Sequence, residues 1–418
     1  MKVVSIADIA LFIRNGKSIK QDDRLGGLPI TRIETIADGT INSAKVGFAG
    51  ISLAGNEDWV LKDGDILISH INSTKHLGKC AQYNGSPEPL IHGMNLLNLR
   101  CNQSKAFPRY VFHYLKSKQL LKQIPRITKN SVNQSSFTVT AFKELAIHLP
   151  PLPEQKRIAA ILDKADAIRR KREKAIELTD SFLRSVFLEM FGDANTNLAK
   201  TNVKSIEQLI SEGMLLLHKD GNFGSSYPKA EEFGDVGVPF LTARSFTDSG
   251  ELIVNNVQFL NEDKADSLGY GWVSNDDVLL AHNATVGRVA HYNCNFDKAL
   301  VGTSLTIYRP NKERLLPDYL TAALRSPAFQ AQLTKNMSQT TRNQVPITAQ
   351  RKLKIPVPNL DCQKEFSKIA YQVGLVLKRL NASQEHSKDL IRSLSATLLS
   401  EPEDIMAPSS IIQAPHAL

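Results

Sequence analysis

Residues 145–156, Leu-Ala-Ile-His-Leu-Pro-Pro-Leu-Pro-Glu-Gln-Lys, have a second copy at residues 353–364, Leu-Lys-Ile-Pro-Val-Pro-Asn-Leu-Asp-Cys-Gln-Lys. In both copies a proline-rich phrase comes before a long run of helix-forming residues, and proline prevents the preceding element from continuing into that run. The copies lie about half a chain apart in a protein of 418 residues. This spacing predicts an internal duplication, which determines the architecture.

Further segments repeat in the same order, at nearly the same separation. The matched segments are Gly27–Arg32 with Gly237–Arg244, Asp65–His70 with Asp277–His282, Gly78–Asn84 with Gly287–Asn293, Phe107–Tyr110 with Leu316–Tyr319, and Asn133–Gln134 with Asn343–Gln344. Residues 1–149 and 194–358 contain short β-rich runs that are bounded by Gly, Asn, Asp and Pro. This pattern predicts two similar α+β domains with these boundaries.

Each domain is followed by a segment with the periodicity of a long helix, residues 150–193 and 359–400. Mainly apolar and small residues recur at alternating spacings of three and four, which is the heptad pattern of a coiled coil. The expected contact residues are Ile158, Ile161, Ala165, Ile168, Arg172, Ala175, Thr179, Phe182 and Val186 in the first helix, and Phe366, Ile369, Val373, Val376, Leu380, Ser383, Ser387, Leu390 and Leu394 in the second. A narrow apolar stripe needs a partner in water, so we expect the helices to pack on each other. The alternative is that each helix folds back on its own domain. Residues 401–418 show little patterning and are expected to form a disordered tail.

Composition limits the compartment and the type of site. Four scattered cysteines with no Cys-x-x-Cys pair offer neither a disulfide framework nor a zinc site. We expect a cytoplasmic protein, because no signal peptide and no membrane-spanning stretch can be recognised. The net charge is +9, and residues 1–149 hold 19 of the 51 basic but only 11 of the 42 acidic residues. This excess favours a polyanionic partner for the first domain.

Candidate nucleic-acid contacts lie in two polar loops of each domain. Amide, hydroxyl and guanidinium groups hydrogen-bond base edges, while cations bind phosphates. In the first domain the candidates are Ser69, His70, Asn72, Lys75 and His76 after one strand, and Lys129, Asn130, Asn133 and Gln134 in a later loop. In the second domain they are His282, Asn283 and Arg288, and then Arg342, Asn343 and Gln344. Loop tips are often polar without binding anything, so the equivalence of the loops between the copies is what supports this assignment.

Catalytic motifs are not recognisable in the sequence. No phosphate-binding Gly-x-x-x-x-Gly-Lys-[Ser/Thr] loop, Gly-x-Gly-x-x-Gly, His-Glu-x-x-His or Gly-x-Ser-x-Gly motif occurs. The pattern predicts a recognition protein with no catalytic residue and no metal site. Two alternatives stay open: a DNA endonuclease or methyltransferase with an unrecognised motif, and an assembly scaffold that does not read DNA.

Residues 149–166 and the following segment, which ends in Phe187-Leu-Glu-Met-Phe-Gly192, resemble the central conserved region of specificity subunits of type I restriction-modification systems. The second copy departs from this pattern at Cys362, where the first has Glu154. The opening of the second domain, Asp220-Gly-Asn-Phe-Gly with Gly237–Arg244, resembles the recognition domains of that family. The similarity extends to about residue 400.

The resemblance implies a specific assembly. Two target recognition domains would each read one half of a bipartite, asymmetric site in double-stranded DNA, and two long antiparallel helices would set the spacing. Two modification subunits would dock on the helices and bring S-adenosylmethionine, and restriction subunits, where present, would use ATP and Mg²⁺. No cofactor is expected in this chain.

Overall fold

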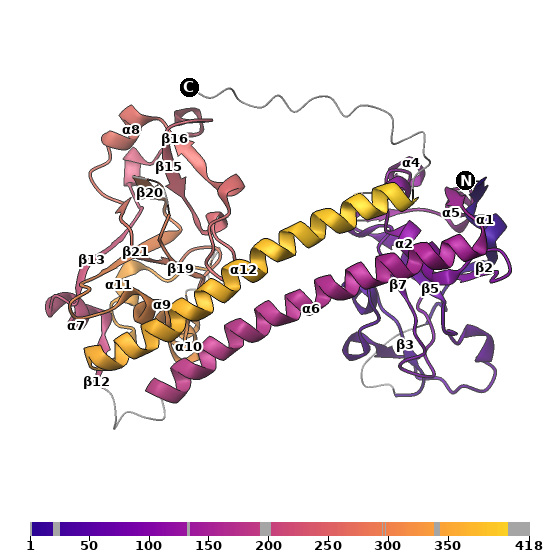
Figure 1. Ribbon diagram of the computed structural model, residues 1–418, viewed down its shortest axis with the longest axis horizontal. Coiled ribbons are helices and arrows are strands. Elements are labelled where there is room, and N and C mark those ends of the chain that lie inside the picture. Colours follow the sequence, from indigo (N-terminus) through magenta and orange to yellow (C-terminus); the bar gives the residue numbers. More distant parts are fainter. Residues whose placement is uncertain are drawn as a thin grey trace. The chain divides into compact units, whose positions relative to one another are not determined.

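The computed structural model describes residues 2–19, 26–131, 134–192, 202–294, 296, 298–337 and 343–399. The chain forms two compact units, residues 1–172 with 383–418, and residues 173–382 (Figure 1). Each unit contains one α+β domain and one part of each of two long helices, α6 (Leu152–Phe191) and α12 (Leu360–Leu399). The tail, residues 401–418, lies outside the described residues. Among the described residues, no helix is long and apolar enough to cross a membrane.

The first domain is built on a four-stranded antiparallel sheet. Its strands, in order across the sheet, are β2 (Ala10–Asn15), β8 (Leu96–Cys101), β5 (Ile66–Ser69) and β7 (Cys80–Gln82). Alternate residues of β5 point to opposite faces, as the pleat of a strand requires. Ile66 and Ile68 enter the core that also contains Tyr110 of α2 (Pro108–Leu115), whereas Leu67 enters a second cluster. Burial on both faces explains why three successive residues of this strand, Ile66, Leu67 and Ile68, are all apolar.

The remaining elements of the first domain are short. They are β1 (Lys2–Ser5), α1 (Ile6–Ile9), β3 (Pro29–Ile30), β4 (Gly47–Phe48), β6 (Ile71–Asn72), α3 (Lys118–Leu121), α4 (Ile124–Ile127), β9 (Lys129–Asn130), β10 (Ser135–Ser136), α5 (Val139–Lys143) and β11 (Ala146–Leu149). Strand β1 pairs with β11, so the two ends of the domain meet immediately before α6 begins.

The second domain repeats this plan. Its four-stranded sheet has the order β13 (Leu215–Asp220), β21 (Leu305–Pro310), β18 (Val278–Ala281) and β19 (Val289–His291). A five-stranded sheet adds β14 (Phe233–Gly234), β16 (Gln258–Leu260), β15 (Val238–Leu241), β20 (Ala299–Val301) and β17 (Trp272–Val273). The other elements are β12 (Asn202–Ser205), α7 (Ile206–Ser211), α8 (Glu262–Asp266), α9 (Pro317–Arg325), α10 (Pro327–Lys335), α11 (Ile347–Gln350) and β22 (Lys354–Val357). The predicted duplication of a mixed α and β domain is confirmed.

Single side chains repeat their roles in the two copies. Ser5 and Ser205 each cap the first helix of their domain in a capping box. Tyr110 donates its hydroxyl hydrogen bond to the backbone oxygen of His148, and Tyr319 donates in the same way to Pro356. These hydrogen bonds connect α2 to β11 in the first domain and α9 to β22 in the second. Equivalent side chains therefore make equivalent contacts in the two domains.

The long helices begin after proline-containing phrases and contain no interior proline beyond the first turn. Proline is tolerated there because the first turn has no acceptor for its missing N–H. Helix α6 ends at Phe191, and it is followed by Gly192, whose φ of 74° is left-handed and whose N–H donates to the oxygen of Leu188. The helices lie within the predicted ranges of 150–193 and 359–400.

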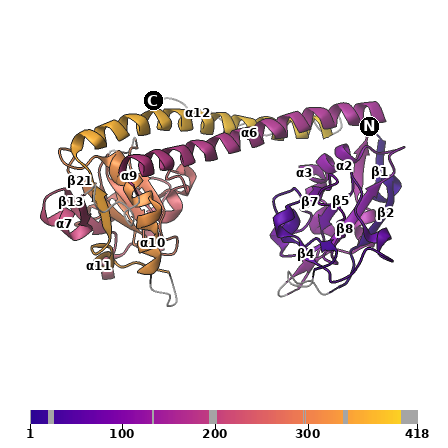
Figure 2. The same ribbon diagram turned by 90° about the horizontal axis from the view of Figure 1, so that it is seen from below.

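The two helices pack antiparallel in both units. In the first unit, Ile158 and Leu162 near the start of α6 share a core with Leu399 at the end of α12. In the second unit, the rings of Phe187 and Phe366 lie 5.6 Å apart. Figure 2 shows α6 running along the side of the first domain where α2 lies. In each unit, the parts of α6 and α12 thus pack on each other and on the domain of that unit.

The predicted contact stripe is partly wrong. Arg172 lies at the contact and donates to the backbone oxygen of Ser383 at 3.0 Å. The predicted contact residues Ile168, Phe182, Val376 and Leu390 are instead exposed. The domains cover a face of the helices that lies next to the predicted stripe. Leu162 and Phe187, which are outside that stripe, are therefore buried.

Candidate nucleic-acid interface

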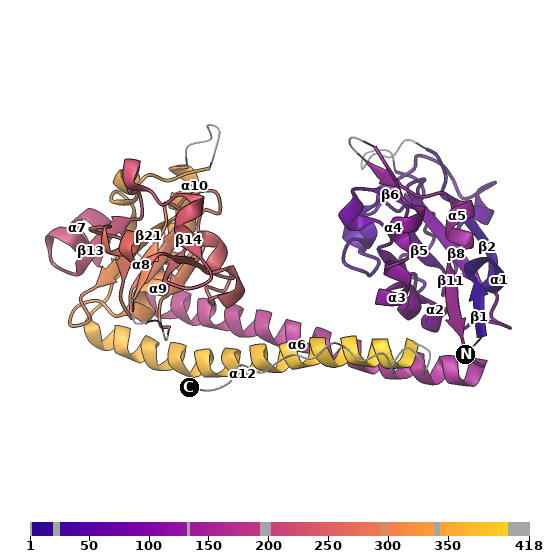
Figure 3. The same ribbon diagram turned by 90° about the horizontal axis from the view of Figure 1, so that it is seen from above.

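The two candidate loops of the first domain lie side by side. Strand β6 pairs with β10, and β10 pairs with β9, in one three-stranded antiparallel sheet. The Ser135 hydroxyl joins the loops, because it contacts the Thr74 hydroxyl at 2.7 Å and donates to Oδ1 of Asn130 at 2.8 Å. Figure 3 shows β6 at the end of the first domain away from α6. The predicted loops therefore form one surface.

The candidate loops of the second domain meet in the same way. Asn283 and Gln344 form an antiparallel bridge. The N–H of Ala284 donates to the oxygen of Asn343 at 3.0 Å, and the N–H of Val345 donates to the oxygen of His282 at 2.9 Å. Two segments that are far apart in sequence thus become neighbours in both copies.

Most of the candidates that the structure describes are accessible. Exposed residues are Lys75, Lys129, Asn130, Gln134 and Asn343, and half-buried ones are Asn72, His76, Asn283 and Gln344. The side chain of Asn72 is held by Ser69, whose hydroxyl accepts from Nδ2 at 3.2 Å. Candidates Asn133 and Arg342 lie outside the described residues. The accessible set is dominated by amides and lysines, which suit bases and phosphates respectively.

Three other candidates need correction because their side chains are buried. Ser69 and His282 are each 1% exposed, and His70 is 4% exposed. Burial lowers the pKa of His70 to about 4, so this imidazole is neutral at pH 7, and its ring packs edge-on against Phe137. Nδ1 of His282 lies 2.9 Å from the hydroxyl of Thr306, and burial lowers its pKa too. These three side chains therefore lie beneath the loops, closed off from solvent.

Arg288 is also a structural residue. Its Nη1 donates to the backbone oxygens of Ala243 and Phe246, each at 2.7 Å, and its Nε donates to Asp248 at 3.0 Å. With its donors directed at the protein, this guanidinium holds residues 243–248 in place. The sequence pattern could not separate it from a phosphate contact, because a Gly-Arg pair in a loop fits either role.

The strands beneath the loops are fixed by a buried ion pair in each domain. Asp65 is 1% exposed and accepts two hydrogen bonds from Arg100, at 2.7 and 2.6 Å. Asp277 and Arg309 form the same bidentate pair, at 2.8 Å for both bonds. Hydrogen bonding to Asp277 raises the pKa of Arg309. These pairs lock neighbouring strands, so the loops that follow β5 and β18 start from a rigid base.

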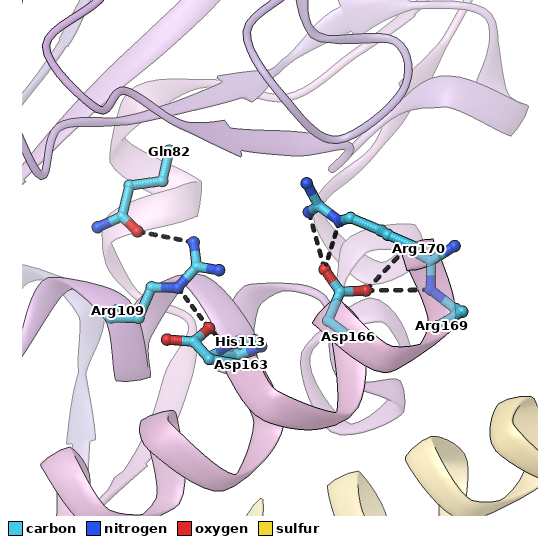
Figure 4. Close-up of polar contacts among 7 residues, drawn as sticks. All are labelled: Gln82, Arg109, His113, Asp163, Asp166, Arg169 and Arg170. Carbon is cyan, nitrogen blue, oxygen red and sulfur yellow. Dashed lines mark hydrogen bonds and ion pairs between the residues drawn. The ribbon is translucent and has the colours of Figure 1, made fainter. Parts of the chain in front are cut away.

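A second polar network joins α6 to the first domain (Figure 4). Asp163 accepts from Nε of Arg109 at 2.6 Å and lies 2.7 Å from Nε2 of His113. Arg109 also donates to Gln82 of β7 at 3.0 Å. Burial lowers the pKa of His113 despite this carboxylate. One turn further, Asp166 pairs with Arg169 and Arg170, each at 2.8 Å.

Comparison with known proteins identifies the family. Residues 1–178 and 223–385 match the model of the type I restriction modification DNA specificity domain. The chain belongs to the type I DNA specificity family.

Relatives of this specificity chain carry corresponding names. It is 35% identical over 325 residues to a Methanocaldococcus jannaschii protein provisionally named the type I restriction enzyme MjaX specificity subunit, covering 75% of this chain and 73% of that one. It is 24% identical over 418 residues to the MjaVIII specificity subunit of the same organism, covering 95% and 92%.

Solved structures share the fold of this specificity chain. The type I restriction-modification S subunit from M. genitalium aligns with a TM-score of 0.58 at 14% identity, over 96% of both chains. A structure described under complex assembly and conformational transition of the type I R-M system aligns at 0.50 and 17% identity, covering 95% of this chain and 97% of that one. Among the described residues of this specificity chain, no three His, Cys, Asp or Glu side chains are grouped to hold a metal ion.

Proposed function

We propose that this chain is the DNA-reading subunit of a type I restriction-modification complex, in which each α+β domain recognises one half of a bipartite site. The paired loops carry this proposal. In each domain, two segments that are distant in sequence converge on one surface over a locked sheet. Loops on a rigid scaffold are the usual place for binding residues.

The two surfaces differ in chemistry, which supports an asymmetric site. The first presents Lys75, Lys129 and Asn130, whereas the described part of the second presents Asn343 and the half-buried Gln344. Lysines can bind phosphates or the acceptors of guanine, and amides can bind an adenine edge through two hydrogen bonds. The two half-sites would therefore have different sequences.

The long helices would dock two modification subunits and set the number of unread bases. Each helix has 40 residues and so is about 60 Å long at about 1.5 Å per residue. Large apolar side chains stay exposed on both helices in both units: Ile168, Leu178, Phe182, Tyr371, Val376 and Leu390. Apolar side chains of this size at a surface mark sites for protein partners when they cluster.

The catalytic steps belong to the partner subunits. The modification subunits would bring S-adenosylmethionine to the target adenine, and restriction subunits, where present, would bring ATP and Mg²⁺. The family role of this chain is recognition without catalysis. Its docking faces would position those active sites on the chosen sequence.

A binding selection with the assembled complex tests the proposal. The chain, co-purified with its modification subunits, is presented with randomised duplex DNA, and bound sequences are counted. We expect two fixed half-sites with a constant spacer, and Asn343→Ala should relax one base pair of one half by about 5- to 150-fold. A complex that binds all duplexes equally would support the scaffold alternative. Methylation by the purified chain alone would support the enzyme alternative.

A further inference from the structure

A buried polar network joins the two paired loops of the second domain to its sheet. It is centred on the side chain of Gln350 in α11, which is fully buried. Its Oε1 accepts from the hydroxyl of Tyr308 at 2.8 Å, and its Nε2 donates to Oγ1 of Thr306 at 3.1 Å and to the backbone oxygen of Val345 at 2.9 Å. One amide therefore connects strand β21 to the segment that follows the candidate Gln344.

Thr306 extends the network to the other loop. Its hydroxyl oxygen accepts from Gln350, so its hydrogen is available to Nδ1 of His282, which lies 2.9 Å away. Burial lowers the pKa of His282 and so favours the neutral ring, in which one nitrogen can accept a hydrogen bond. The backbone oxygen of this histidine accepts from the N–H of Val345 at 2.9 Å. Both loops are thus held to one point on β21.

Two members of the network are direct neighbours of candidate base contacts. His282 precedes Asn283, and Val345 follows Gln344, and these two candidates form an antiparallel bridge. Hydrogen bonds require a narrow range of distances and angles, so a satisfied buried network favours one arrangement of the groups that it joins. The separation of the two candidate amides would therefore depend on the network beneath them.

The first domain holds its equivalent loops together by apolar packing. The equivalent residues are Leu97 for Thr306, Phe137 for Val345 and Phe142 for Gln350. The rings of Phe137 and Phe142 stack at 5.6 Å, and the ring of His70 lies edge-on against Phe137 at 6.2 Å. Apolar packing is not directional in the way that hydrogen bonding is. The polar network is therefore a feature of the second domain.

We propose that Thr306 and Gln350 are positioning residues that determine the base preference of the second half-site without contacting DNA. Both side chains are fully buried, so they act only through the loops that they hold. The proposal rests on the proposed function, because it requires these loops to read bases. It concerns residues that lie outside both candidate loops.

Substitutions at Thr306 test the role of its hydroxyl, in the complex of the chain with its modification subunits and with randomised duplexes. Valine keeps the volume and removes the hydrogen bonds. Discrimination at one or more base pairs of the second half-site should then fall about fivefold or more, the effect of one buried group without a partner. Thr306→Ser keeps the hydroxyl and should retain the wild-type preference. Gln350→Leu should alter the same base pairs as Thr306→Val, and Thr306→Val keeps the test valid if Gln350→Leu misfolds.

Thr321→Val is the matched control. Thr321 is 8% exposed, and its hydroxyl donates to the backbone oxygen of Pro317 at 2.8 Å. The same substitution in the same domain thus removes a buried hydrogen bond that stays within one helix. Both half-sites should keep their base preferences in this variant, and a loss of melting temperature that it shares with Thr306→Val measures general destabilisation. The first half-site should also stay unchanged in the variants of Thr306 and Gln350.

The outcomes separate this inference from the proposed function. If the wild-type complex selects no bipartite sequence, both fail. If it selects one and Thr306→Val and Gln350→Leu retain every base preference, only the positioning role fails. That role also fails if Thr306→Ser is altered as much as Thr306→Val, because the hydroxyl would then be irrelevant. An equal change of the second half-site in Thr321→Val would overturn it too, because the effect would then be general destabilisation.

Discussion

Gln155 is fully buried at the start of α6 and joins the helix to the first domain with three hydrogen bonds. Its Oε1 accepts from the N–H of Phe107 at 2.7 Å, and its Nε2 donates to the backbone oxygens of Lys105 and Pro150, at 3.0 and 2.8 Å. Gln155→Leu keeps the approximate volume but leaves three backbone groups without a partner. We expect this single change to weaken the joint between α6 and α2.

The size of the effect follows from the cost of unpaired polar groups. Each buried group without a partner costs about 1–3 kcal/mol. Three groups give at least about 3 kcal/mol, which raises the population of the opened state roughly 100-fold. Amide hydrogen exchange followed by mass spectrometry measures this directly, because protection factors report local opening free energies. Peptides from residues 105–115 should exchange roughly 100-fold faster.

The duplication supplies the matched control. Gln363 accepts from Leu316 at 2.8 Å and donates to Arg314 and Pro358, at 3.3 and 3.0 Å. Gln363→Leu should accelerate exchange in residues 314–324 and leave the first domain unchanged. An acceleration below about threefold at residues 105–115 in Gln155→Leu would refute the idea that this side chain holds the joint.

Three further outcomes are expected. Lys75→Ala should weaken binding of the complex to all duplexes alike and reduce the salt slope by about 1, measured by titration at several salt concentrations. Phe182→Asp should reduce binding of modification subunits in pull-down assays while the melting temperature stays within about 2 °C, because this side chain is 55% exposed. Burial lowers the pKa of His291, but ion pairs with Asp318 and Asp276 outweigh burial and raise it. The stability that protonated His291 adds is therefore fully present below the unfolded pKa of about 6.5 and is lost as pH rises through the higher folded value. His291→Gln should abolish this loss, which denaturant titrations measure as the difference in the free energy of unfolding between pH 6 and pH 8.

The repeat made much of the architecture predictable. Because Asp65–His70 and Asp277–His282 have the same pattern, equivalent strands and following loops could be expected, and both occur. The meeting of residues 71–72 with residues 135–136 was not predicted, since sequence spacing does not show which loops pair. The repeat gave one indication of this pairing, because both candidate loops occur in each half of the chain.

Burial was the main quantity that the sequence did not reveal. His70 and His282 lie next to polar, accessible residues in sequence, yet both turn inward below the loops. The prediction of the contact residues on the long helices was partly wrong for a related reason. The heptad rule assumes that one helix covers another, whereas here a domain also covers Leu162 and Phe187 and leaves Phe182 exposed. A third packing partner cannot be read from the periodicity of one segment.

The two copies attach their long helix to the preceding domain through the same contacts, but they differ further along the helix. Gln155 and Gln363 make the same three contacts, so the attachment of each long helix is shared. Eleven positions further along each helix the copies diverge: Asp166 is bound by two arginines, whereas Gly374 lines a cavity of about 220 Å³. Glycine inside a helix costs about 1 kcal/mol relative to alanine, and no side chain fills the space. A partner that docked on both helix attachments would therefore meet two faces that differ in charge and shape.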